Sequence, residues 1–352
     1  MKTSITSLKP LKPKKILIRS TNWIGDAIIT TPAVHSIRKN FPNAFISILV
    51  HPWVADVFNS SPDVDEVLIY EKKGIHSGLS GMWRLSRKLS SYSFDLAILL
   101  QNAFEAAFII MLAGIPARAG YKTDGRGFLL THGVSFKKGI KKIHQVHYYQ
   151  EMVKSLGLTP EPDKLSLELP ESKKKWAREF ISFIKKGPVV GLNPGAAFGP
   201  AKRWPAEKFG KLALLLSKEL DAVMFVFGTK ADKSVNAEIH DFAPGNVIDL
   251  AGKTSLAEAM ALIEVCDAFV SNDSGLMHVG AALKTPMAAI FGSTNPITTG
   301  PFSENAVVIQ KNLDCSPCLK THCKTDFECM LAITAEEVFE TVNSMIEKRE
   351  KI

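Results

Sequence analysis

The chain has 352 residues, of which 46% are hydrophobic and 22% charged, and its formal net charge is +8. This balance is typical of a soluble globular protein, and the length predicts about two domains. No stretch predicts a transmembrane helix, because Gln101, Asn102 and Glu105 interrupt the most apolar run, and no apolar run follows the basic N-terminus as in a secretory signal. We therefore expect a cytoplasmic protein. The positive charge favours an acidic partner, such as a phosphorylated substrate or an anionic membrane, and no nucleic-acid-binding motif is present.

The first half of the chain alternates short apolar runs with helical patterns. Strands are predicted at 15–19, 45–50, 67–70 and 96–100, and helices at 27–40 and 82–89, with a turn at 22–26. Strands that alternate with helices at this spacing predict βαβ units and a parallel sheet. A proline-rich segment and a lysine-rich helix at 173–185 then interrupt the alternation, as expected of a linker region.

The alternation resumes in the second half. Strands are predicted at 188–192, 222–227, 268–271 and 287–291, and helices at 206–220, 255–265, 275–283 and 335–351. We therefore expect an α/β protein with two tandem, doubly wound, Rossmann-like domains and a ligand-binding cleft between them. The predicted divisions are an N-terminal domain at 1–170, a second domain at 171–334 and a C-terminal helix at 335–352.

The first motif that carries chemistry is the turn at 22–26, from Asn22 to Asp26, directly after the first strand. Its glycine spacing differs from that of the dinucleotide-binding fingerprint. Asp26 begins a helix, so it either caps that helix or presents a carboxylate that can take a proton from a substrate hydroxyl.

Two strand-to-helix loops of the second half predict an anion site. The loop at 193–205 is rich in small residues and contains Lys202 and Arg203, a combination that suits a phosphate or diphosphate. The segment at 271–278 places Asp273, Ser274 and Gly275 at the start of a helix, whose free amides attract anions. The alternative is an ordinary loop and an ordinary helix cap.

Two further clusters lie near other predicted strand ends. The loop at 291–296 has small polar residues and is either a plain turn or a place where a nucleotide meets the backbone. Residues 118–132 gather basic and hydroxyl side chains, among them Arg118, Tyr121 and Arg126, which suit phosphates on a substrate or form a solvated loop.

Five cysteines are present. Cys266 lies in an apolar context and is expected to be packed. The other four cluster at Cys315, Cys318, Cys323 and Cys329, where they are free thiols or a structural zinc site of loose ligand spacing. We assign this cluster no catalytic role.

The loops at 23–26, 193–205 and 272–278, with the CSPC segment at 315–318, together resemble glycosyltransferase family 9, and most closely its lipopolysaccharide heptosyltransferases of type II. The resemblance spans residue 16 to the C-terminus. It implies a GT-B fold and an inverting transferase at the cytoplasmic face of the inner membrane. The donor would be ADP-L-glycero-β-D-manno-heptose, the acceptor the inner-core heptose of lipopolysaccharide, and neither a metal ion nor a cofactor would be needed.

The resemblance also implies roles for individual residues. Asp26 would be the general base, and the second domain would bind the donor with Lys202, Asp232, Asp273, Ser274, Gly275 and His278. The first domain would bind the acceptor, for which the candidates are Asn22, Arg118, Tyr121 and Arg126. Three alternatives remain: a type I or III heptosyltransferase, a non-catalytic nucleotide-sugar binding protein, and a nucleotide-sugar 2-epimerase, which shares the GT-B fold.

Overall fold

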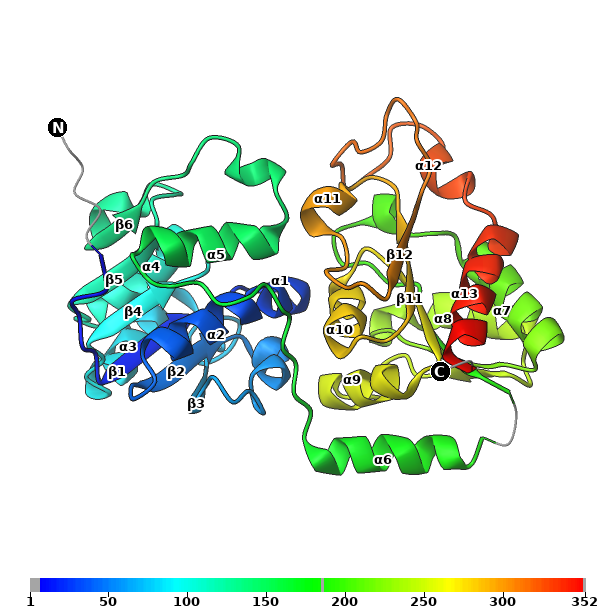
Figure 1. Ribbon diagram of the computed structural model, residues 1–352, viewed down its shortest axis with the longest axis horizontal. Helices are drawn as coiled ribbons and strands as arrows, with labels where there is room; N and C mark the ends of the chain where they lie inside the picture. Colours follow the sequence, from blue (N-terminus) through cyan, green and yellow to red (C-terminus); the bar gives the residue numbers. More distant parts are fainter. Residues whose placement is uncertain (1–6, 185–186, 351–352) are drawn as a thin grey trace. The chain divides into compact units, whose positions relative to one another are not determined.

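The computed structural model describes residues 7–184 and 187–350. The chain divides into two compact units, residues 1–168 and 169–352, and Figure 1 colours it along the sequence. The sequence predicted a division after residue 170. The first part of the basic N-terminus, residues 1–6 with Lys2, and the predicted ends of the helices at 173–185 and 335–351 lie outside the described residues.

The first unit contains a six-stranded parallel sheet in the order β3-β2-β1-β4-β5-β6. Its strands are β1 (Lys15–Arg19), β2 (Phe45–Val50), β3 (Glu66–Ile69), β4 (Leu96–Leu99), β5 (Ala117–Tyr121) and β6 (His132–Val134). This order is that of a Rossmann fold, whose ligand crevice lies at the carboxyl ends of β1 and β4, where the strand order reverses.

Helices lie between these strands, and α5 follows the last of them (Figure 1). They are α1 (Ile24–Ile29), α2 (Thr31–Asn40), α3 (Gly78–Ser91), α4 (Phe104–Leu112) and α5 (Gln145–Ser155), with 3₁₀ turns η1 (Pro52–Val57), η2 (Arg126–Leu129) and η3 (Ile140–Lys142). The single helix predicted at 27–40 is wrong in detail. Pro32 lacks the N–H that would continue a helix from α1, so the chain breaks at Thr30 and starts again.

The sheet of the first unit is covered on both faces. Leu17, Leu49 and Leu99 pack with α3 and α4 in one apolar cluster. Alternate strand residues, such as Ile18 and Ile48, are equally buried and point to the other face. This burial explains why the strands read as continuous apolar runs.

The second unit repeats this architecture, with a sheet in the order β12-β11-β10-β7-β8-β9. Its strands are β7 (Val189–Asn193), β8 (Val223–Val226), β9 (Val247–Asp249), β10 (Ala268–Asn272), β11 (Met287–Phe291) and β12 (Ala306–Gln310). Here the order reverses between β7 and β10. The predicted α/β class with two tandem Rossmann-like domains is therefore confirmed.

The helices of the second unit pack around this sheet (Figure 1). They are α6 (Glu171–Ser182), α7 (Ala206–Leu220), α8 (Lys233–Phe242), α9 (Leu256–Val265), α10 (Gly275–Leu283), α11 (Pro296–Thr299), α12 (Glu328–Leu331) and α13 (Ala335–Glu350), with 3₁₀ turns η4 (Pro200–Lys202) and η5 (Lys230–Asp232). The helix predicted as a separate C-terminal segment joins the core, because Val338, Val342 and Ile346 of α13 pack with Leu212 and Leu216 of α7.

In the described residues, no helix combines the length and apolarity needed to cross a bilayer.

Candidate functional site

The first candidate site lies at the carboxyl ends of β7 and β10, where the strand order of the second sheet reverses. Asn193 ends β7, and its side-chain amide donates to Ser271 Oγ at 2.9 Å and to Ser274 Oγ at 2.7 Å, across the two strands. Asn272 ties the same loops together by donating to Pro194 O at 2.7 Å and accepting from Trp204 N at 3.1 Å. These buried amides hold the predicted loops side by side.

Lys202 and Asp273 form a buried ion pair in this site. Lys202 Nζ lies 2.5 Å from Asp273 Oδ2, and the two side chains are 13% and 6% exposed. Thr294 Oγ1 donates to the same carboxylate oxygen at 2.6 Å, and the ammonium lies 4.7 Å from the centre of the Phe198 ring. The sequence singled out the loop that contains Thr294 but not this contact. Asp273 thus holds a lysine ammonium at the strand ends.

The start of α10 lies beside this pair. Ser274 is the N-cap and Gly275 the first helical residue, so no side chain covers the first free amide. The free amides and the positive end of the helix dipole attract an anion. His278 is buried in the same helix, at 5% exposure.

Asp232 also lies at these loops. Its carboxylate accepts from the amide and hydroxyl of Thr229 at 2.8 and 2.7 Å, in a capping box that precedes α8. A Cβ added at Gly195 would lie 3.4 Å from Asp232 Oδ2, so this carboxylate sits directly beside the loop that leads to Lys202.

The four clustered cysteines are free thiols, and in the described part of the chain no three His, Cys, Asp or Glu side chains form a metal-binding group. Burial and the neighbouring thiols raise the pKa of Cys329. A structural metal site at these four cysteines stays a prediction from the sequence. Cys266 is packed, as predicted, and its thiol donates to Leu262 O.

The cysteine-rich segment instead supports the site through its backbone. Thr321 O accepts from Ala201 N at 3.1 Å, in the 3₁₀ turn that carries Lys202. Leu319 N donates to Ser293 O at 2.7 Å, next to Thr294. The segment therefore joins the two loops that hold the Lys202–Asp273 pair.

The second candidate site lies in the first unit, after β1. Asn22 accepts from Arg19 Nη2 at 3.0 Å through its side chain, and its backbone carbonyl accepts from Trp53 Nε1 at 2.8 Å. Arg19 is buried, which lowers its pKa to about 10, and its guanidinium lies 5.5 Å from the centre of the Tyr70 ring. This network fixes the turn at 22–26 and was not visible in the sequence.

Asp26 lies in the first turn of α1 and is partly exposed. Tyr149 of α5 senses this carboxylate. Burial raises the pKa of the Tyr149 phenol well above its ordinary value, and the negative charge of Asp26 is the second cause. Tyr149 is therefore a neutral neighbour of the carboxylate at neutral pH. Asp26 is thus placed at the carboxyl end of β1, at the switch point of the first sheet.

Three residues predicted to bind an acceptor have hydrogen-bond partners within the first unit. Arg126 is fully buried and donates to Tyr121 O at 3.0 Å and Asn102 Oδ1 at 3.1 Å. Tyr121 is 2% exposed, and its hydroxyl donates to Tyr148 O at 2.9 Å. Arg118 donates to two backbone carbonyls at 2.6 and 2.7 Å. Arg126 and Tyr121 are buried, whereas Arg118 is partly exposed, and an acceptor-binding role for the three stays a prediction from the sequence.

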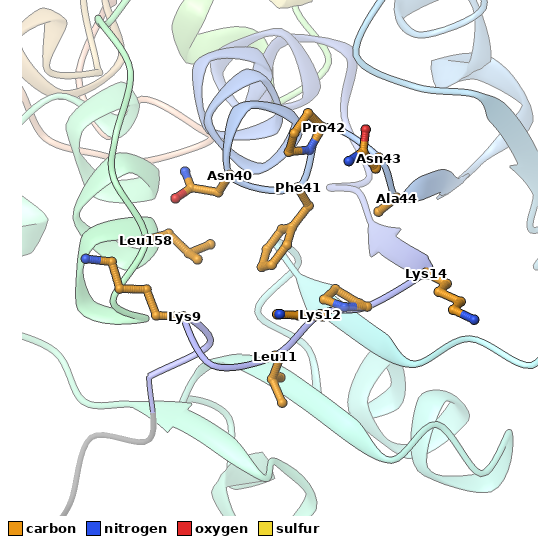
Figure 2. A pocket seen from close by; sticks show the side chains of 11 residues that line it. Lys9, Leu11, Lys12, Lys14, Asn40, Phe41, Pro42, Asn43, Ala44 and Leu158 are labelled. Carbon is orange, nitrogen blue, oxygen red and sulfur yellow. The ribbon is translucent and has the colours of Figure 1, made fainter.

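A pocket of about 430 Å³ lies at the opposite, amino-terminal end of the first sheet (Figure 2). Lys9, Lys12 and Lys14 surround it, and Phe41 and Leu158 line it. Because ligands of Rossmann sheets bind at the carboxyl ends of the strands, this pocket is separate from both candidate sites.

Comparisons with known proteins agree with this arrangement. The model for glycosyltransferase family 9 (heptosyltransferase) matches residues 82–327. The lipooligosaccharide heptosyltransferase 2 of Haemophilus influenzae is 32% identical over 84% of this chain and 88% of its own length. The lipopolysaccharide heptosyltransferase 2 of Escherichia coli is 30% identical over 96% of this chain and 99% of its own length.

The solved structure of E. coli ADP-heptose lipopolysaccharide heptosyltransferase II superposes with a TM-score of 0.82 at 29% identity, covering 96% of this chain and 99% of that one. The two Rossmann-like domains are thus those of a GT-B glycosyltransferase. The family model covers more than half of the chain, and the relatives extend over most of the remainder. The chain belongs to glycosyltransferase family 9, the heptosyltransferase family.

Proposed function

We propose that the enzyme transfers a heptose from ADP-L-glycero-β-D-manno-heptose to the inner-core heptose of lipopolysaccharide, with inversion at the anomeric carbon. Relatives named heptosyltransferase 2, which match 84% and 96% of the chain, support this type of transfer. The observation that carries the proposal is the buried Lys202 ammonium, held by Asp273 beside the free amides of α10.

The second unit would bind the donor. The diphosphate is anionic, so its partners are Lys202 and the amides at Gly275, with Ser274 and His278 beside them. Asp273 carries the same charge as a phosphate and would repel it. We therefore assign Asp273 to holding Lys202 in place and to the sugar hydroxyls, and Asp232 to a ribose hydroxyl.

The first unit would supply the base. The acceptor hydroxyl oxygen forms a bond to the anomeric carbon while the bond from that carbon to the diphosphate oxygen breaks, and its electron pair leaves with ADP. The hydroxyl proton passes to the Asp26 carboxylate, and Asn22 lies in the same fixed turn. Negative charge grows on the departing diphosphate, where Lys202 stabilises it.

We also propose that the enzyme acts at the cytoplasmic face of the inner membrane, since its acceptor is a lipid. ADP release from ADP-heptose, measured with three acceptors, tests the function: a core with one heptose, a heptose-free core and a longer core. Release that needs the single-heptose core, with a heptose-sized mass gain, is expected. Release only with another core would indicate a type I or III enzyme. Tight donor binding without release on any acceptor would indicate a binding protein.

A further inference from the structure

The outer face of α3 and the loop before it expose apolar side chains that have no role in either candidate site. Ile75, Leu79 and Trp83 are 55%, 79% and 60% exposed. Leu79 and Trp83 are four residues apart on α3, so they lie on one face of the helix. The opposite face, with Leu85 and Leu89, is already buried in the core. The exposed residues are therefore not needed to attach α3 to the sheet.

The loop before α3 is held against the helix, which makes these residues one surface. Arg84 Nη1 donates to Ile75 O at 3.1 Å, and a Cβ added at Gly81 would lie 2.1 Å from the backbone carbon of His76. His76 N in turn donates to Glu71 O at 3.1 Å. We call Ile75, Leu79 and Trp83, with Arg84 and Arg87, the α3 patch.

The patch itself is basic, although Glu71 precedes its loop and Lys72 pairs with Glu105. From residue 72 to residue 94 the chain has five lysines and arginines and no aspartate or glutamate. The Arg87 guanidinium lies 5.3 Å from the centre of the Trp83 ring, on the same helix face. Among the described residues, neither Arg84 nor Arg87 pairs with a carboxylate. Their charge therefore remains available to an anionic partner.

We propose that the α3 patch docks on an anionic lipid bilayer. Exposed tryptophan and leucine beside unpaired arginines form the pattern of an interfacial helix, whose apolar side chains enter the headgroup region while its cations meet lipid phosphates. A second protein chain would need acidic groups to match the same charge. This inference extends the membrane location given under the proposed function, and it concerns the surface that reaches the membrane rather than the reaction.

Vesicle co-sedimentation tests the proposal, with phosphatidylcholine vesicles and with phosphatidylcholine–phosphatidylglycerol vesicles. The full chain is expected to bind the anionic vesicles, and less so as salt is raised. Leu79→Ser with Trp83→Ser should lower the partition coefficient about tenfold or more. Arg84→Gln with Arg87→Gln should lower binding to anionic vesicles about thirtyfold, at about fivefold for each arginine, and leave binding to neutral vesicles unchanged.

Matched controls come from the second unit. Phe183 is 82% exposed and is not part of the patch, so Phe183→Ser removes an exposed apolar side chain from the other unit. Lys218→Gln with Lys284→Gln removes the same charge as the arginine pair, also from exposed positions. Both controls should bind vesicles like the unmodified chain. Trp83→Phe keeps the apolar character and should bind, but lose the blue shift of tryptophan emission that vesicles produce.

Three results would overturn the proposal. The first is no binding of the unmodified chain to anionic vesicles. The second is an equal loss in Phe183→Ser. The third is a dimer in solution that Leu79→Ser with Trp83→Ser converts to monomer without changing vesicle binding, which would make the patch a self-association surface. Because the assay needs neither donor nor acceptor, its outcome is independent of whether ADP release supports the proposed reaction.

Discussion

Replacing Lys202 by methionine tests the donor site through two measurements. In the structure its ammonium lies 2.5 Å from Asp273 Oδ2, and both side chains are largely buried. Removing one partner of a buried ion pair typically costs about 3–5 kcal/mol, because the other charge stays buried. Here Thr294 still donates to the carboxylate, so we expect the lower end of that range.

The second measurement is ADP affinity. A hydrogen bond to a charged group contributes about 1.5–3 kcal/mol, so losing the contact between Lys202 and the diphosphate should weaken ADP binding about 10- to 150-fold. Titration calorimetry gives the affinity, and urea unfolding gives the stability. Lys211→Met is the matched control, since Lys211 pairs with Glu207 at 2.7 Å with both side chains more than half exposed. It should cost less than about 1 kcal/mol and leave ADP binding unchanged.

A double variant separates the two effects. Lys202→Met with Asp273→Asn has no unpaired buried charge, so much of the lost stability should return while ADP affinity stays low. The assignment of Lys202 to the diphosphate is refuted if Lys202→Met binds ADP within twofold of the unmodified chain. The burial of the Lys202–Asp273 pair in solution is refuted if the single variant is no less stable than Lys211→Met.

Three further predictions concern Asp26, Thr294 and His51. Asp26→Asn should lower turnover about 10²- to 10⁴-fold with ADP affinity unchanged, and retained turnover would remove it as the base. Thr294→Val removes a hydrogen bond to Asp273 and should lower the free energy of unfolding in urea by about 1–3 kcal/mol. Thr294→Ser keeps the hydroxyl donor and should be as stable as the unmodified chain. Burial, and after it the charge of Arg19, lower the pKa of His51, so its contribution to stability is present above about pH 6.5 and is lost as pH falls. His51→Gln should reduce that acid sensitivity in thermal melts, and an unchanged pH profile would contradict the assignment.

The bounds of strands and helices were predicted most accurately where apolar runs lie between turns. The bounds predicted for β1, β2, β11, α7 and α10 agree with the structure. Strand β5 was missed because Arg118 and Gly120 weaken its local pattern, and pairing with β4 and β6 overrides that weakness. Strands β6 and β9 have three residues each and lie at sheet edges, where a sequence pattern is too short to recognise.

Strand order also explains which candidate residues lie at a site. Asp26 follows β1, Lys202 follows β7 and Asp273 follows β10, and these strands flank the reversals of order in the two sheets. Arg118 and Tyr121 belong to β5, one strand removed from the first reversal, and they donate to the carbonyls of Leu129 and Tyr148. Spacing along the chain could not separate these groups, because both follow a βα pattern. The type of a residue predicts what its side chain can bind. The position of its strand in the sheet decides whether that side chain lies at the ligand crevice or in the core.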